Sequence, residues 1–259
     1  MLLRSAGHET LHMKAMILAA GLGTRLRPLT DNKPKALVEV GGRTLLEITL
    51  ARLRSFSVTE VIVNVHHFAE MMQAYLKEKR NFGIRVEVSS EDVLLDTGGG
   101  LKQAAWFFEE DKNGEPFLLH NVDVISTIDL GQMVEEHNRS GALATLAVQE
   151  RKSSRQLLFD ERGHLCGRRP SGGGADEIVR PSERLQPLAF SGIHVISTRF
   201  LEMMSERGVF SIIETYLRLA RAGERIRAFR ADQYYWRDLG RPEHIEQAEL
   251  DLGKKILAC

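Results

Sequence analysis

The chain has 259 residues, of which 43% are hydrophobic and 27% are charged, a composition that is ordinary for a soluble globular protein. Its 35 basic residues balance its 35 acidic residues, so a basic surface is not indicated and we expect no nucleic-acid partner. The two cysteines, Cys166 and Cys259, are too few for a disulfide framework or a zinc cluster, which fits a reducing, cytoplasmic compartment.

The organisation of the chain is expected to be simple. The longest apolar runs are too short to span a bilayer, so no membrane partner is expected. Residues 1–12 lack the apolar core of a signal peptide and are interpreted as a loosely ordered extension. No long linker follows, so residues 13–259 are expected to form a single domain, with an α/β half at 13–150 and a more mixed half at 151–259.

Strands and helices alternate through the first half. The predicted strands are residues 15–20, 61–65, 84–88, 117–120 and 142–148. The predicted helices are a segment that begins at the capping-box form Thr44–Glu47, and residues 69–79, 99–108 and 130–138. This order predicts an α/β fold with a doubly wound, mostly parallel sheet and helices on both faces.

The second half has less helix between its strands. Its predicted strands are residues 157–160, 164–167, 188–196, 225–230 and 234–238. Helices are predicted from Ser211 to about Ala222 and from Pro242 to about Lys255. Residues 168–175 are rich in glycine and are predicted to form a loop.

A glycine loop follows the first strand. It reads Gly21-Leu-Gly-Thr-Arg25, with Lys35 further along, and lies where ligands bind in an open parallel sheet, at the carboxyl edge. Glycines let backbone N–H groups approach an anion, Arg25 can bind two phosphate oxygens, and Lys35 adds a compact charge. The loop therefore predicts a polyphosphate site; a basic surface loop with turn glycines is the alternative. Leu26 replaces the third glycine of the dinucleotide fingerprint, and the Gly-Lys-Ser/Thr ending of a Walker loop is absent.

Two aspartates follow predicted strands at the same edge. Asp123 comes after the strand at 117–120, and Asp238 after Tyr234-Tyr-Trp. Magnesium usually binds through one or two carboxylates together with substrate phosphates and water, so this pair is a candidate metal site. The alternative is that both aspartates serve only as turn or cap residues.

Five motifs resemble the sugar-1-phosphate nucleotidyltransferases, over Met13 to about Leu250. The first is the glycine loop with Pro34-Lys35. The others are Leu95-Asp-Thr-Gly-Gly-Gly100, Asn121-Val-Asp123, Phe190-Ser-Gly-Ile193 and Trp236-Arg-Asp-Leu-Gly240. The second and fourth motifs look most like the mannose-1-phosphate guanylyltransferase and N-acetylmuramate-1-phosphate uridylyltransferase branches.

The resemblance implies a cytoplasmic, magnesium-dependent enzyme of nucleotide-sugar synthesis for the cell envelope. Its substrates would be a nucleoside triphosphate, bound by residues 13–150, and a sugar 1-phosphate, bound mainly by residues 151–259. The implied catalytic residues are Arg25, Lys35 and Asp123. The implied nucleotide-binding residues are Ala20, Gly21, Gly23, Thr24, Arg25, Lys35, Thr97, Gly98 and Asp123. The implied sugar-binding residues are Asn121, Gly192 and Asp238, and the implied metal ligands are Asp123 and Asp238.

Two departures from the family pattern concern the sugar side. Many relatives carry glycine where this chain has Val122, and a β-branched side chain there is expected to narrow the pocket. Arg168 and Arg169 lie near the position of a lysine that meets the sugar phosphate in relatives. The sequence leaves two roles open for these arginines, which are contact with the substrate and a solvated charge pair.

Two other functions remain open at this point. An enzyme that joins a nucleotide to phosphocholine would need an aromatic cage, for which Tyr235 and Trp236 are the available cluster. A nucleotide-sensing module without catalysis is the other alternative, although such a module would not need Lys35 or the aspartates. The base, the sugar and the oligomeric state are not determined by the sequence.

Overall fold

The computed structural model describes residues 13–110 and 114–253, so the predicted extension at 1–12 lies outside the described residues. Strands from both halves of the chain form one ten-stranded sheet. These strands are β1 (Met13–Leu18), β4 (Val58–Val65), β5 (Arg85–Ser90), β6 (Phe117–Asn121), β8 (Ala144–Gln149), β9 (Gln156–Phe159), β10 (Leu165–Arg169), β11 (Glu177–Ile178), β12 (Gln186–Ile196) and β13 (Ile226–Arg230).

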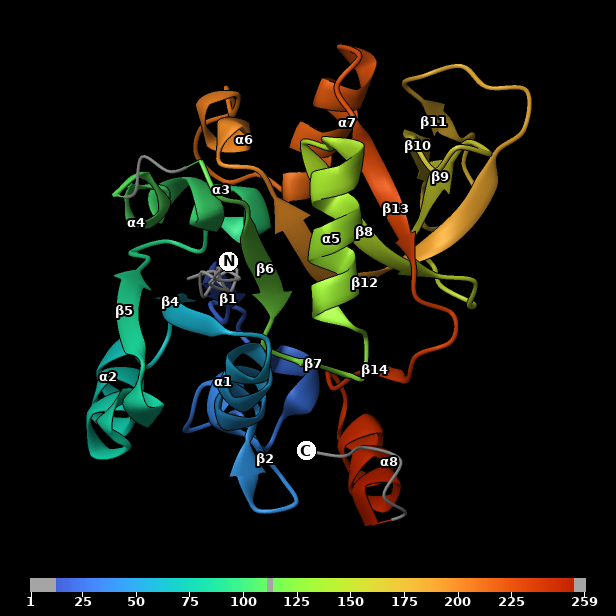
Figure 1. The fold of residues 1–259 in the computed structure, drawn as a ribbon. Coiled ribbons are helices and arrows are strands. Elements are labelled where there is room, and N and C mark those ends of the chain that lie inside the picture. Colours follow the sequence, from blue (N-terminus) through green and yellow to red (C-terminus); the bar gives the residue numbers. More distant parts are fainter. Residues whose placement is uncertain (1–12, 111–113, 254–259) are drawn as a thin grey trace, which may run out of the picture.

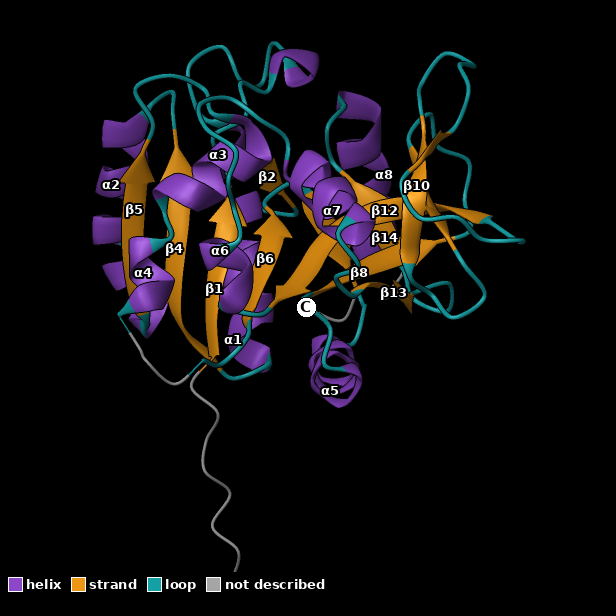
Figure 2. Cartoon of the chain, turned by 90° about the horizontal axis from the view of Figure 1, so that it is seen from above, coloured by secondary structure: helices purple, strands orange, loops and turns teal. Residues whose placement is uncertain are grey.

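A parallel block forms the first part of this sheet. Strands β5, β4, β1 and β6 lie side by side in that order, as Figure 2 shows. Ala15 in β1 is paired with Val61 on one side and with Leu118 on the other, in parallel register. The carboxyl ends of these strands therefore meet at one edge, which carries the glycine loop.

Strand β12 joins the parallel block to the second half. It pairs antiparallel with β6, β8 and β9, and β13 pairs parallel with β8. Strands β9, β10 and β11 continue antiparallel at the end of the molecule opposite β5 (Figure 1). The structure is thus the expected α/β fold, with a parallel first part and a mixed second part.

Helices cover both faces of the sheet. Side chains alternate along β1, so that Ala15 and Ile17 enter one hydrophobic cluster and Met16 enters the other. The helices are α1 (Leu45–Ser55), α2 (Ala69–Glu78), α3 (Asp96–Gln103), α4 (Trp106–Glu109), α5 (Leu130–Ser140), α6 (Arg199–Glu202), α7 (Ile212–Arg221) and α8 (Pro242–Gly253). The first cluster includes side chains of α1, α5 and α8, and the second includes side chains of α3, α4 and α7.

Several predicted elements differ from the structure. The helix predicted at 99–108 is two helices, α3 and α4, with Ala104 and Ala105 between them. Arg168 and Arg169 belong to β10 instead of a loop. Four short strands were not predicted: β2 (Glu39–Val40), β3 (Arg43–Thr44), β7 (Val124–Ser126) and β11. The strand predicted at 234–238 is present but shorter, as β14 (Trp236–Asp238). The capping-box form at Thr44 is borne out in its first half, since Thr44 Oγ1 accepts the N–H of Glu47 at 3.1 Å.

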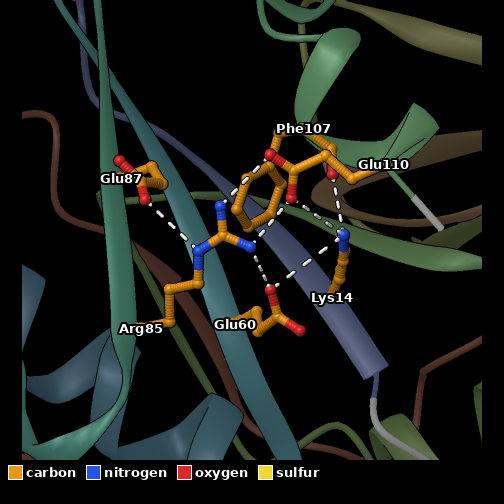
Figure 3. Close-up of polar contacts among 6 residues, drawn as sticks. All are labelled: Lys14, Glu60, Arg85, Glu87, Phe107 and Glu110. Carbon is orange, nitrogen blue, oxygen red and sulfur yellow. Dashed lines mark hydrogen bonds and ion pairs between the residues drawn. The ribbon is translucent and has the colours of Figure 1, made fainter.

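A cluster of charged side chains closes the amino ends of the parallel strands, as Figure 3 shows. Arg85 lies among three carboxylates, with Nη1 2.8 Å from oxygens of both Glu60 and Glu110 and Nε 3.2 Å from Glu87. Lys14 donates to the Phe107 carbonyl at 2.8 Å and lies 3.6 Å from Glu110. The Arg85 guanidinium holds the pKa of Glu110 below its usual value. This cluster fastens the end of α4 to β1, β4 and β5.

None of the helices within the described residues has both the length and the apolar character needed to cross a membrane.

Candidate active site

The glycine loop leaves the carboxyl end of β1 and turns sharply at Gly23. Gly23 has φ of +64°, and a Cβ there would lie 2.9 Å from Cγ2 of Thr30. The Gly23 carbonyl accepts the N–H of Leu26 at 2.8 Å and the hydroxyl of Thr30 at 2.9 Å. Both the backbone conformation and the lack of space therefore require glycine at this position. Gly21 is different, because a Cβ there would meet open space.

The loop presents N–H groups that are not used by the fold. Ala19 donates its N–H to Oδ1 of Asn64 at 2.8 Å, which fixes the end of β1 against β4. The next N–H groups, those of Ala20, Gly21 and Leu22, have no hydrogen-bond partner within the described residues. Adjacent N–H groups without internal partners form the kind of concavity that binds an anion.

Lys35 and Asp123 meet beside this loop. Lys35 begins a short 3-10 helix (Lys35–Leu37) that follows the extended Pro34, and Asp123 follows β6. The Lys35 ammonium is ion-paired with Oδ2 of Asp123, and the two side chains are only 11% and 16% exposed. The structure thus brings together two predicted catalytic residues that are far apart in the sequence.

Asp238 and Arg25 approach the same place from other elements. Strand β14 pairs antiparallel with β7, so that Asp238 lies opposite Val124, and the Leu239 N–H donates to the Asp123 carbonyl at 2.7 Å. A Cβ at Gly240 would lie 2.7 Å from Oδ1 of Asp238 and 2.8 Å from Nη2 of Arg25. Gly240 therefore leaves room for the carboxylate and the guanidinium to lie side by side.

The two aspartates leave oxygens for a further partner. Oδ1 of Asp123 and Oδ2 of Asp238 accept no hydrogen bond from any described residue, while Oδ1 of Asp238 accepts the Gly240 N–H at 2.9 Å. Within residues 13–110 and 114–253, no group of three or more His, Cys, Asp or Glu side chains could hold a metal ion. A metal at this edge would therefore rely on the two carboxylates and on substrate oxygens.

The predicted sugar-binding residues Asn121 and Gly192 are in contact. Gly192 has φ of +75° at an irregularity in β12, and a Cβ there would lie 2.7 Å from Nδ2 of Asn121. Val122, the departure from the family pattern, is 3% exposed, and its N–H donates to the Leu18 carbonyl at 3.1 Å. The Val122 side chain belongs to the same hydrophobic cluster as Val124.

The glycine triplet at 98–100 lies inside α3, which begins at Asp96, three residues before the helix predicted at 99–108. A Cβ at Gly98 would lie 2.4 Å from the Phe210 ring, and one at Gly99 would lie 2.6 Å from the Gly208 carbonyl. The N–H groups of Gly98 and Gly99 both donate to the Phe210 carbonyl. Glycine is thus explained here by the close packing of α3 against the segment before α7. Nucleotide binding by Gly98 stays a prediction.

A cavity of about 340 Å³ opens at this edge of the sheet. Six predicted site residues line it: Ala20, Gly21, Lys35, Thr97, Asn121 and Asp123. The predicted residues that do not line it are Gly23, Thr24, Arg25, Gly98, Gly192 and Asp238. The cavity is also lined by Val122, which was expected to narrow the pocket, and by residues that sequence reasoning did not assign: Leu18, Ala19, Asn64, Leu94, Asp96 and Val209.

Asn64 is the most informative of the unassigned residues. It is 2% exposed, and it links three segments, because Oδ1 accepts from Ala19 while Nδ2 donates to Oε1 of Glu91 at 2.7 Å. Glu91 Oε2 in turn accepts the N–H of Leu95 at 3.0 Å. A signal for this role existed, since a polar side chain interrupts the apolar strand Val-Ile-Val-Asn-Val. Both carboxylate oxygens of Glu91 are thus used within the fold.

Comparisons with known proteins agree with this geometry. The family model for nucleotidyl transferases matches residues 14–255. The N-acetylmuramate alpha-1-phosphate uridylyltransferase of Caulobacter vibrioides is 34% identical over 251 residues, which cover 93% of this chain and 97% of the relative. A mannose-1-phosphate guanyltransferase of Gibberella zeae is 29% identical over 235 residues, and the match spans only 62% of that relative.

Two solved structures share the fold. HddC from Yersinia pseudotuberculosis, in complex with GMP-PN, has a TM-score of 0.73 at 21% identity and covers 93% of this chain and 99% of its own. A UDP-glucose pyrophosphorylase in complex with UDP-glucose has a TM-score of 0.74 at 18% identity and covers 94% of this chain and 99% of its own. The chain belongs to the nucleotidyl transferase family and is an enzyme of the sugar-1-phosphate nucleotidyltransferase type.

Proposed function

We propose that the enzyme joins a nucleoside triphosphate to a sugar 1-phosphate by direct in-line displacement. An oxygen of the sugar phosphate forms a bond to the α-phosphorus, the bond from that phosphorus to the bridging oxygen breaks, and pyrophosphate leaves. The observation that carries this proposal is the arrangement at the carboxyl edge of the sheet. There, N–H groups of the glycine loop that have no hydrogen-bond partner among the described residues lie beside the Lys35–Asp123 ion pair. Because the attacking phosphate is already anionic, no protein nucleophile is required, and catalysis is positioning plus charge neutralisation.

In this proposal, different groups of the enzyme bind different phosphates of the substrates. The N–H groups of the glycine loop and the Arg25 guanidinium bind the leaving pyrophosphate, for which a planar fork of donors is suited. Lys35 bridges the α-phosphate and its attacker, because it is held at the cavity wall by Asp123. A polyphosphate that enters the cavity brings negative charge that competes with Asp123 for the Lys35 ammonium.

A magnesium ion would be held by Asp123 and Asp238. The donor set fits this ion, since magnesium is bound through one or two carboxylates together with substrate phosphates, and each aspartate has an oxygen without a partner among the described residues. When bound, the ion supplies positive charge against the phosphate oxygens. Asp123 keeps its second role, which is to orient Lys35.

For the substrates, we propose uridylyl transfer to N-acetylmuramate 1-phosphate as the first candidate. The support is that the Caulobacter vibrioides uridylyltransferase is matched over 97% of its length, whereas the guanyltransferase of Gibberella zeae is matched over 62%. Guanylyl transfer to mannose 1-phosphate is the second candidate. Uridylyl transfer would place the enzyme in the cytoplasm, in the supply of precursors for the cell envelope.

Phosphocholine finds less support as a substrate. The guanidinium carbon of Arg151 lies 3.7 Å from the centre of the Trp236 ring, so one face of that ring is already occupied by a cation. The Tyr235 hydroxyl donates to Asp251 at 2.7 Å and accepts from Arg237 at 2.8 Å, which ties it to α8. The two aromatic residues are therefore engaged within the fold and do not present an aromatic cage.

The test is a pyrophosphate-release screen that crosses five nucleoside triphosphates with a panel of sugar 1-phosphates, and with phosphocholine as a separate arm. We expect release that depends on both substrates and on magnesium, highest with UTP and N-acetylmuramate 1-phosphate. Release with phosphocholine alone, or none with any sugar 1-phosphate, would contradict the proposal.

A further inference from the structure

Arg151, just beyond β8, was not assigned by sequence reasoning and lies among the residues of the predicted sugar side. Its guanidinium stacks on Trp236 of β14, and its Nη2 donates to the Phe190 carbonyl of β12 at 2.7 Å. The Trp236 Nε1 donates to the Ser191 carbonyl at 2.7 Å. The guanidinium is therefore held rigidly between β14 and the Phe190-Ser-Gly-Ile motif.

Most donors of this guanidinium are not used within the fold. An arginine has five N–H donors, and the structure shows only the bond from Nη2 to Phe190 among the described residues. Nε is buried and has no hydrogen-bond partner in the part of the chain that the structure describes. Burial lowers the pKa of Arg151 while the negative charge of Asp238 acts in the opposite direction, so the cation lies near the proposed metal ligand. A rigid, half-buried cation with unused donors suits a phosphate group, which accepts several such bonds.

The other candidate cations are occupied. Arg168 donates from Nε to Glu177 at 2.7 Å, and Arg169 donates from Nε and Nη2 to the two oxygens of Asp176, both at 3.0 Å. These pairs lie across the β10–β11 hairpin, at the end of the sheet opposite β5 (Figure 1). The pairing fits the interpretation of Arg168 and Arg169 as a charge pair, because each cation on this strand already faces a carboxylate.

We propose that Arg151 binds the phosphate group of the sugar 1-phosphate and orients it for attack. This inference rests on the proposed function, since it assigns a residue to the second substrate of that reaction. The Arg151 fork neutralises part of the phosphate charge, which lowers its repulsion from the triphosphate. The contacts with Trp236 and with the Phe190 carbonyl fix the orientation of the Arg151 guanidinium. The phosphate that it binds is thereby oriented with one oxygen directed at the α-phosphorus.

The experiment compares Arg151→Met with the wild-type enzyme in steady-state kinetics, with N-acetylmuramate 1-phosphate and mannose 1-phosphate as probes. Loss of charge-assisted hydrogen bonds to phosphate is expected to raise KM for the sugar 1-phosphate roughly 10- to 100-fold. KM for the triphosphate should change by less than about threefold, because its phosphates lie on the glycine loop. Arg151→Lys keeps the charge without the fork and should recover part of the loss.

Arg168→Met is the matched control, since it removes a paired arginine from the same half of the chain; its KM values should stay at the wild-type level. Thermal melts show whether each variant folds, and if Arg151→Met does not, Arg151→Lys carries the test with a smaller rise in the same KM. Three outcomes would overturn this inference but not the proposed function. They are an unchanged KM for the sugar 1-phosphate in folded Arg151 variants, an equal rise in KM for both substrates, and a raised KM in Arg168→Met. A wild-type enzyme that releases no pyrophosphate would overturn the proposed function, and this assignment with it.

Discussion

The two edges of the parallel block differ in whether their charged groups have partners within the protein. At the amino edge, Lys14 and Arg85 are surrounded by carboxylates, and each of these cations has at least two acidic partners. At the carboxyl edge, Arg25 forms no salt bridge with a described residue, and the loop N–H groups of Ala20 and Gly21 have no partner there. The same strands thus carry a charge network that is complete at one end and incomplete at the other.

The difference indicates which charges serve stability and which serve a ligand. A paired network on the surface contributes a modest amount to stability and needs nothing else. Charged and polar groups without a partner among the described residues remain available to a ligand, and adjacent N–H groups of this kind can bind an anion. Substitutions at the carboxyl edge should therefore change activity, and substitutions at the amino edge should change stability.

The largest effect is expected at the two aspartates. Asp123→Asn and Asp238→Asn should each lower turnover by roughly 10³-fold, because either change removes charge from one shared magnesium site. The double variant should be scarcely worse than either single one, since the same site is broken in all three. The measurement is a double-mutant cycle on turnover with melts as a folding control. Cleanly additive losses, or full activity in a chelator, would mean that the aspartates share no metal.

Lys35 and Arg25 come next. Replacement of either by alanine should lower turnover by roughly 10²- to 10³-fold, because contacts that form in the transition state are lost. Arg25→Ala should leave the melting temperature unchanged, as its side chain is exposed. Single-turnover rates of pyrophosphate release measure the effect. Near-normal turnover in Lys35→Ala would exclude a role for this ammonium at the α-phosphate.

Val122 tests how finely the carboxyl edge selects its substrate. Val122→Gly should change the ranking of sugar 1-phosphates by roughly tenfold in relative kcat/KM, because it enlarges the pocket by a few methyl-sized groups. The ranking of triphosphates should change less. Because Val122 is buried, a lower melting temperature is also expected, and Val122→Ala serves as the intermediate variant. Equal shifts in both substrate series would contradict the pocket argument.

The smallest effect is expected at the amino edge. Arg85→Met should lower the melting temperature by roughly 1 to 4 °C at neutral pH and leave kcat and KM unchanged. The pKa of Glu110 is lowered in the folded protein, so its contribution is present above the pKa of the unfolded state and is lost as the pH falls through the folded pKa. The difference between variant and wild type should therefore shrink on acidification, and Glu87→Gln is a milder control. A loss of activity at full stability would show that the two edges are coupled.

Much of the parallel block could be predicted because its signals are local. The apolar run of β1, the glycines that follow and the cap at Thr44 depend on neighbours within a few residues. The short strand β7 carried no such signal, and nothing local indicated that it pairs with β14. They pair across more than a hundred residues, and Val124–Ser126 and Trp236–Asp238 are each three residues long. Their pairing is what brings Asp238 to Asp123.

By itself, the sequence determined the order of the elements and the residues with the chemistry for phosphate, since residue type and spacing decide both. Only the tertiary structure decided which of those residues have partners. In the sequence, Arg168 and Arg169 were as plausible as any other arginine for binding a phosphate. In the structure they pair with Glu177 and Asp176 across the β10–β11 hairpin. Arg151 had no distinguishing neighbour in the sequence, and its place over Trp236 results from the packing of β14 against β12. A charge becomes available to a ligand only when no neighbour in space neutralises it, and those neighbours are set by the order of strands in the sheet.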